Sequence, residues 1–180
     1  MDKLFACNLA VFPHSICPPR GGNPTTIFLG DLDETQMQYL AKQTTHECGF
    51  VLCSPVPENG DCHLTMRYWV PNHEMEMCGH ATIGAIWLLN ELGRLPMTTG
   101  NIRVSTKSGV VDARVLRIAS DSHVRILVSQ PRGQVDDLSD TYVSQINSCL
   151  GISLDDFMPG HRVHNARTSR TKTLVPVWGV

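Results

Sequence analysis

The stretch Arg67–Leu89, RYWVPNHEMEMCGHATIGAIWLL, decides the fold. The run His63–Trp69 alternates polar and apolar residues and predicts a strand, which a Pro-Asn turn ends. The run Ala81–Leu89 contains one threonine and otherwise only apolar residues and glycine, so we expect a helix with no face left for water. At about nine to twelve residues this helix is too short to span a bilayer. It is therefore expected to be a core helix that other elements enclose.

The loop before this helix places Cys78, Gly79 and His80 at the amino end of the helix. Unpaired N–H groups and the positive end of the helix dipole favour an anion at such an end. The same dipole disfavours an imidazolium and favours a neutral His80 ring that donates or accepts a hydrogen bond. We expect ligand to bind here, and a purely structural role for His80 is the alternative.

Three motifs, taken in their order along the chain, carry a family resemblance. They are Gly22-Asn23-Pro24 before an apolar strand, His46-Glu47-Cys48-Gly49-Phe50-Val51 after a helix, and Cys78-Gly79-His80-Ala81-Thr82 after a strand that ends in Tyr68-Trp69-x-Pro71. Together they resemble the phenazine-biosynthesis isomerase-like (PhzF-like) family. The resemblance covers residues 4–177 and is strongest over residues 21–90.

The resemblance implies an α+β fold in which a curved mixed β-sheet or barrel wraps around one central buried helix, as in diaminopimelate epimerase. It also implies the first half of a two-domain, pseudo-symmetric molecule. Residues 1–130 are expected to form the family's N-terminal domain. Residues 131–180 are expected to be a linker and the beginning of a truncated second domain.

Local patterns predict the remaining elements. Strands are expected at Leu4–Phe12, which is apolar enough to be buried, and at Thr25–Leu29, Phe50–Cys53, Ile102–Thr106, Val110–Leu116, Val124–Val128 and Thr173–Val177. A helix is expected over Glu34–Thr44, because Asp33 and Gln36 have the spacing of a capping box. Another is expected where Val143, Ile146 and Leu150 share a helical face that ends at Gly151, and the polar stretch Pro131–Ser139 is expected to be a linker.

Composition restricts the kind of partner. A net charge of −2 without a Lys/Arg cluster argues against nucleic acid and against a membrane surface, so we expect a small-molecule ligand. Seven cysteines without CxxC spacing, and an amino terminus unlike a signal peptide, predict reduced thiols in a cytoplasmic protein. The eight histidines are scattered and no phosphate loop or dinucleotide motif occurs, so we expect neither a metal nor an organic cofactor.

The resemblance implies a reaction as well: isomerisation of a small carboxylate-bearing metabolite by moving a proton between carbons, without a cofactor, in a protein that is expected to be a homodimer. It places Glu47 at the catalytic glutamate, with His80 as its catalytic partner. Asn23, Cys78 and Gly79 are expected to bind substrate.

Taken by itself, Glu47 is a carboxylate at the junction of a helix and an apolar strand, where partial burial suits a general base but a surface charge is the ordinary case. Its neighbours His46 and Cys48 depart from the family, which has serine before the glutamate and small polar residues after it. Glu74 and Glu76 are both expected to be solvated, although Glu74 matches a family position.

Two other functions stay open. Relatives that racemise proline or epimerise diaminopimelate use a cysteine pair, and Cys78 stands at the place of the first cysteine, with Cys149 as the one candidate later in the chain. Alternatively, the chain is an inactive binding protein. This second alternative arises because no acidic residue with a Gly/Ser-rich loop, which the family sets opposite its catalytic glutamate, follows position 131.

Overall fold

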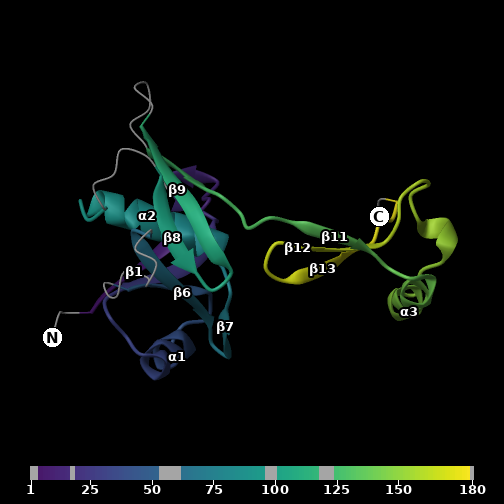
Figure 1. Ribbon diagram of the computed structural model, residues 1–180, viewed down its shortest axis with the longest axis horizontal. Helices are drawn as coiled ribbons and strands as arrows, with labels where there is room; N and C mark the ends of the chain where they lie inside the picture. The colour runs from purple at the N-terminus through teal and green to yellow at the C-terminus, as the bar shows by residue number, and fades with distance from the viewer. Residues whose placement is uncertain (1–3, 17–18, 53–61, 96–100, 118–123, 179–180) are drawn as a thin grey trace. The chain divides into compact units, whose positions relative to one another are not determined.

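The computed structural model describes residues 4–16, 19–52, 62–95, 101–117 and 124–178. The chain divides into two compact units, Met1–Gln130 and Pro131–Val180. Each unit is described by itself (Figure 1). The final residue of the predicted strand Phe50–Cys53 lies outside the described residues.

The first unit contains a curved sheet and the helices α1 (Glu34–Lys42) and α2 (Gly79–Glu91). The sheet strands are β1 (Phe5–Val11), β4 (Asn23–Leu29), β5 (Cys48–Leu52), β6 (Leu64–Val70), β7 (His73–Met75), β8 (Ile102–Thr106), β9 (Gly109–Arg117) and β10 (Val124–Val128). A two-residue hairpin, β2 (Ser15–Ile16) with β3 (Pro19–Arg20), lies in the predicted loop between β1 and β4. The predicted strands that became β8 and β10 are confirmed with the predicted bounds. Those that became β4, β5, β6 and β9 are confirmed with bounds shifted by one or two residues.

The strands run in the order β1-β4-β5-β6-β8-β9-β10, with β7 paired to β6. The sheet is mixed, because β4–β5 and β6–β8 are parallel pairs and the others are antiparallel. Helix α2 packs against β1 and β10, which lie at opposite ends of this order, as well as against β4, β5 and β9. A sheet whose two ends touch one helix must curl around it, as Figure 1 shows. The predicted α+β fold, a curved sheet around one buried helix, is confirmed.

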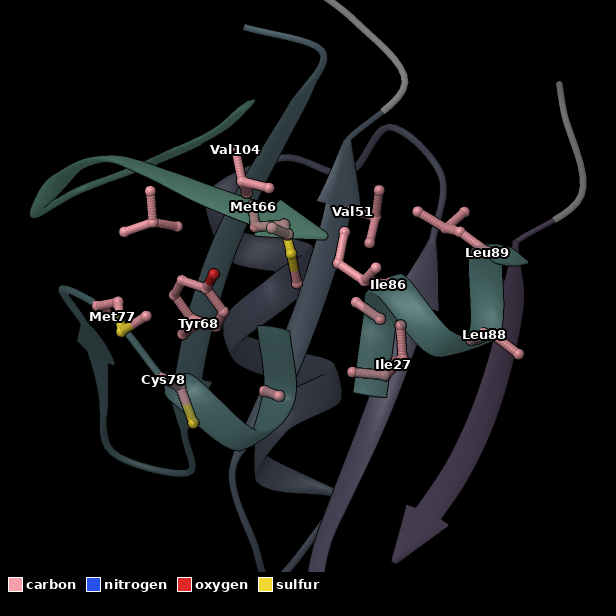
Figure 2. Packing of buried hydrophobic residues seen from close by; sticks show 14 of the residues in the cluster. Ile27, Val51, Met66, Tyr68, Met77, Cys78, Ile86, Leu88, Leu89 and Val104 are labelled. Atoms are coloured by element: carbon pink, nitrogen blue, oxygen red, sulfur yellow. The ribbon is translucent and has the colours of Figure 1, made fainter. Parts of the chain in front are cut away.

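The two faces of the sheet bury different side chains. Ile27, Val51 and Tyr68 belong to the cluster around α2, whereas their chain neighbours Phe28, Phe50 and Trp69 belong to the cluster against α1. This is the period-two alternation of strands, in which successive side chains point to opposite faces. Figure 2 shows the first cluster, with Tyr68, Met77 and Cys78 near the start of α2.

Gly49 allows β5 to lie directly against α2. A methyl group at this position would lie 3.0 Å from Cδ1 of Ile27 and 3.4 Å from Cβ of Ala81, in the first turn of the helix. The first distance is closer than side chains ordinarily approach. Glycine is therefore the residue that brings strand and helix together here.

A buried chain of hydrogen bonds joins β6 to the same turn of α2. The Thr82 hydroxyl donates to the Cys78 carbonyl at 2.8 Å, which uses its one proton. The Tyr68 hydroxyl, 2.7 Å from the Thr82 hydroxyl, must then be the donor of that pair. Both side chains are fully buried, so the start of α2 is tied to the sheet by partners that water does not replace.

Two burial predictions were wrong for one reason. The helix is not enclosed on every side: Trp87 is 38% exposed, beside a groove of about 480 Å³ that β1 and β10 flank. The predicted buried strand Leu4–Phe12 became β1, in which Phe5 is exposed. Among the described strands β1 pairs with β4 alone and β10 with β9 alone, so the sheet leaves a gap over one stripe of α2.

The helix predicted over Glu34–Thr44 is α1, which begins with the predicted capping box and ends two residues earlier, at Lys42. Strand β7 was not predicted, because three residues carry too little alternation to signal a strand.

The second unit is a small antiparallel sheet with one α-helix in its described part. Its elements are β11 (Gln134–Asp137), α3 (Asp140–Leu150), the 3-10 turn Leu154–Asp156, β12 (His164–Arg167) and β13 (Thr171–Leu174), with strand order β11-β12-β13. Helix α3 ends at Gly151 as predicted. The expectation that Pro131–Ser139 is only a linker was wrong, because its polar residues pair as β11 with β12. No residue of α3 is buried.

Replacing Tyr68 with phenylalanine is expected to lower the free energy of unfolding by about 1 kcal/mol, because the buried Thr82 hydroxyl loses its donor. Urea unfolding followed by tryptophan fluorescence measures the change. Tyr39→Phe is the matched control, since Tyr39 is 64% exposed, and it should cost less than about 0.5 kcal/mol. Equal, small effects of both substitutions would contradict the role given to the Tyr68 hydroxyl.

Candidate active site

The amino end of α2 has no side-chain cap. The N-cap residue, Cys78, has extended backbone and provides no side-chain cap, and the first turn of the helix carries no acidic residue. Gly79 and His80 are partly exposed. Their N–H groups belong to the first turn, which has no carbonyl partners within the helix, so an anion placed there meets donors and the positive end of the dipole.

Cys78 and His80 form a pair at this end. The Cys78 Sγ atom lies 3.4 Å from Nδ1 and 4.0 Å from Nε2 of His80, and Cys78 is 4% exposed. The structure thus brings three predicted site residues, Cys78, Gly79 and His80, into one turn. The phenol of Tyr68 lies nearby in the core, where burial raises its pKa, against an opposing hydrogen bond with Thr82, so that it stays a donor.

Glu47 immediately precedes β5 and is partly buried. Its carbonyl accepts from the Thr25 hydroxyl at 2.9 Å and from the Thr26 N–H at 3.4 Å. Both donors come from β4, the parallel neighbour of β5. The backbone of Glu47 is therefore held from two sides, while these bonds leave its carboxylate unused.

The start of β5 lies beside the first turn of α2. Gly49 approaches Ala81, and Gly49 also faces Tyr68, whose hydroxyl reaches Thr82. Residue 47 is two positions before Gly49, which is about 7 Å along a strand and on the same face. The buried Thr25 side chain, bonded to the Glu47 carbonyl, lies within van der Waals reach of Gly84. Extended by two residues, the alternation along β5 predicts that the Glu47 side chain lies on the face of the sheet that α2 covers.

Asn23 is the first residue of β4 and is exposed. Because β4 and β5 are parallel, with Thr26 opposite Cys48, Asn23 lies at the same edge of the sheet as Glu47 and about two residues further out. It follows Gly22, whose φ of +93° suits glycine and whose missing side chain makes room for the Val11 carbonyl. The structure therefore brings Asn23 to the edge of the sheet where β5 begins, and Cys78, Gly79 and His80 to the start of α2.

Glu74 belongs to the other face. Its Oε1 accepts from Nε of Arg67 at 2.6 Å and its Oε2 from Nζ of Lys107 at 3.0 Å, and its side chain is 10% exposed. Arg67 also pairs with Glu34 of α1 at 3.2 Å. The expectation that Glu74 is solvated was wrong, because its partners lie 7 and 33 residues away and leave no local signal. Glu76 is exposed, as predicted.

Some residues around the site were not predicted. Thr25 and Thr26 point to opposite faces of β4, yet both bind the segment 46–47. The side-chain nitrogen of Gln130 lies 3.5 Å from where a Gly79 side chain would begin. Burial raises the pKa of the Cys48 thiol, against an opposing hydrogen bond with Thr44. Except for the contact between Thr44 and Cys48, these contacts join residues distant in sequence, which local patterns do not reveal.

The described residues contain no group of three His, Cys, Asp or Glu side chains that could hold a metal ion. The five cysteines for which the structure gives a state, Cys7, Cys48, Cys62, Cys78 and Cys149, are free thiols. None of the helices in the described part of the chain has the length and apolar character needed to cross a membrane.

The fold has a close counterpart among solved proteins. The crystal structure of the Bacillus anthracis phenazine biosynthesis protein of the PhzF family matches with a TM-score of 0.73 and 27% identity, over 98% of this chain and 56% of that one. The chain thus has the α+β fold of phenazine biosynthesis proteins.

Sequence comparison defines the family. The model of the phenazine biosynthesis-like protein family (PhzC-PhzF) matches residues 12–179, and the chain belongs to this family. The uncharacterized isomerase YddE of Escherichia coli K12 is 29% identical over 164 residues, which are 89% of this chain and 52% of that protein. The 4-hydroxyproline 2-epimerase of Paracoccus denitrificans is 39% identical over 57 residues, 31% of this chain and 17% of the epimerase. The chain spans about half the length of the curated isomerases it matches.

Replacing Glu74 with glutamine is expected to lower the free energy of unfolding at pH 7 by about 1 to 2 kcal/mol. The Arg67 guanidinium, with help from Lys107 and against the effect of burial, holds the pKa of Glu74 below its ordinary value. A lowered pKa stabilises the fold above the unfolded-state value, and this stabilisation is lost as the pH falls through the folded-state value.

The difference between wild type and Glu74→Gln should therefore be full at neutral pH and shrink below about pH 4.5. Urea unfolding at a series of pH values measures it. Glu76→Gln, at an exposed neighbouring position, serves as control and should have little effect at any pH. A difference that grows on acidification would contradict the ion pair.

Proposed function

We propose that this chain carries the base and the anion site of an isomerase that moves a proton between carbon atoms of a small carboxylate-bearing metabolite, without a cofactor. The observation that carries the proposal is the contact of β5 with the first turn of α2 at Gly49. We infer that this contact brings Glu47, which is partly buried, near a helix start that offers N–H donors and has no acidic side chain in its first turn. The isomerase names of relatives support the reaction class.

In the proposed reaction, Glu47 removes a proton from a C–H bond made acidic by a neighbouring carboxylate or conjugated system. The electron pair moves into that system, and negative charge develops on the substrate's carboxylate oxygens. The N–H groups of Gly79 and His80, together with the His80 ring, hold those oxygens. Glu47 then returns the proton to a different carbon, so that the atoms balance and the enzyme ends as it began.

Asn23 and Cys78 are proposed as substrate contacts at the margin and at the base of the site. The acidic residue that the resembled family sets opposite its glutamate, the homodimer and the cytoplasmic location remain predictions for the whole protein. The proposal for residues 1–130 covers only the base and the anion site.

Glu47→Gln is expected to lower the rate of proton exchange at least about a hundredfold, because glutamine keeps the shape of glutamate and loses the base. The assay is incorporation of solvent deuterium, followed by NMR, into cyclohexa-2,5-diene-1-carboxylate, a probe with an activated C–H bond next to a carboxylate. Glu91→Gln, at an exposed carboxylate near the other end of α2, should retain the wild-type rate. Exchange that persists in Glu47→Gln would refute the role of Glu47, and a wild-type chain that binds the probe without exchange would favour a binding protein.

A cysteine-dependent epimerase is the second candidate, favoured by the 3.4 Å approach of Cys78 to His80 and by the match to a 4-hydroxyproline 2-epimerase. In that reaction a Cys78 thiolate would remove the α-proton of an amino acid. The isomerase proposal expects Cys78→Ala to retain more than about a tenth of the exchange into the diene probe. Loss of exchange at the α-carbon of trans-4-hydroxy-L-proline in Cys78→Ala, with Glu47→Gln active, would establish the epimerase instead.

A further inference from the structure

His46, the residue before Glu47, ends a chain of side-chain hydrogen bonds that joins β1, β4 and the segment before β5. The Thr26 hydroxyl lies 2.7 Å from Oδ1 of Asn8, its register partner on β1. The same hydroxyl lies 2.8 Å from Nε2 of the His46 ring. Thr26 is 4% exposed, so its hydroxyl depends on these two partners.

Counting protons fixes the direction of each bond. The Asn8 Oδ1 atom can only accept, so the single hydroxyl proton of Thr26 is donated to it. The Thr26 oxygen must then accept from His46, and the proton of the neutral ring resides on Nε2. The lone pair of the ring is left on Nδ1.

The same threonine also holds Glu47. The Thr26 N–H donates to the Glu47 carbonyl, while its hydroxyl orients the ring of the preceding residue. On the other side of β4, the Thr25 hydroxyl binds the Glu47 carbonyl as well. The His46 carbonyl lies 3.1 Å from the Thr44 hydroxyl, whose one proton is shared between it and the Ala41 carbonyl at 2.9 Å. The two residues before β5 are thus fixed through both carbonyls and one ring.

We propose that His46 is a positioning residue for Glu47: Asn8, acting through Thr26, keeps the His46 ring in its Nε2–H form, and this ring holds the entry to β5. The proposal rests on the proposed role of Glu47 as base. Its first half, the proton position, is a property of the resting protein and does not require activity. A ring whose proton moved to Nδ1 would bond to Thr26 as an acceptor and would shift the segment that carries the base.

Two substitutions of Asn8 distinguish the two neutral forms of the His46 ring. Asn8 is exposed on the edge strand β1, so replacing it leaves the core intact. In Asn8→Asp the new carboxylate again only accepts, so Nε2–H should persist. In Asn8→Val the Thr26 hydroxyl loses its side-chain acceptor on β1. It should then donate its proton to Nε2 of His46, so that the ring carries its own proton on Nδ1. Two-bond ¹H–¹⁵N correlation spectra in buffer alkaline enough for a neutral imidazole distinguish the forms, with His46→Gln identifying the signal.

The positioning role is measured in the same samples. Asn8→Val should shift the backbone amide resonance of Glu47 and lower kcat for deuterium exchange about tenfold, with KM unchanged. Asn8→Asp should match wild type in both. Thr106→Val is the control. It removes the hydrogen bond of a different strand threonine, to the Gly109 carbonyl, and should leave the His46 signal unchanged.

A wild-type ring protonated on Nδ1 would overturn the proposal. So would a proton switch in Asn8→Val that leaves the Glu47 resonance unmoved. If the wild-type protein showed no exchange with the probe, the proposed function would fail. The two NMR readouts would then still decide whether Asn8 and His46 position residue 47.

Discussion

Helix α2 is apolar around most of its circumference, and the rest of the first unit follows from the need to cover it. A helix of this kind is stable in water only when other elements remove its surface from solvent, at about 25 cal/mol for each Å² of apolar area. One flat sheet covers a single stripe of a helix. The sheet therefore curls until strands from both ends of its order, β1 and β10, touch the helix. Gly49 lets the middle of the sheet approach as closely as the edges do.

The same alternation that covers α2 separates the charged residues of the sheet into two groups. Arg67 and Glu74 point to the α1 face, where they satisfy each other and Glu34. No residue of that network is available to the amino end of α2. A carboxylate in the first turn of α2 would itself satisfy the helix start and compete with a bound anion. Glu74 lies on the far face and the first turn of α2 contains no acidic residue, which is compatible with the anion site that we propose there.

Local signals gave most of the fold and the positions of the site residues, whereas contacts between distant residues were beyond them. The capping box of α1, the strands β8 to β10 and the end of α3 each depend on spacing within a few residues. The exposure of β1 depends on what pairs with it, and the polar β11 has a partner some thirty residues later. Motifs singled out Glu47 and His80, but the threonines that hold Glu47 come from another strand.

The way in which Glu47 is held matters for its chemistry. Thr25 and Thr26 bind its carbonyl, not its carboxylate, and hydroxyl and amide donors keep their protons across the ordinary pH range. The position of Glu47 is therefore set by uncharged groups. An arginine beside a carboxylate draws that carboxylate toward its ionised form, as Arg67 does with Glu74. Glu47 is instead held through its backbone by neutral donors, which suits the role of base that we propose for it.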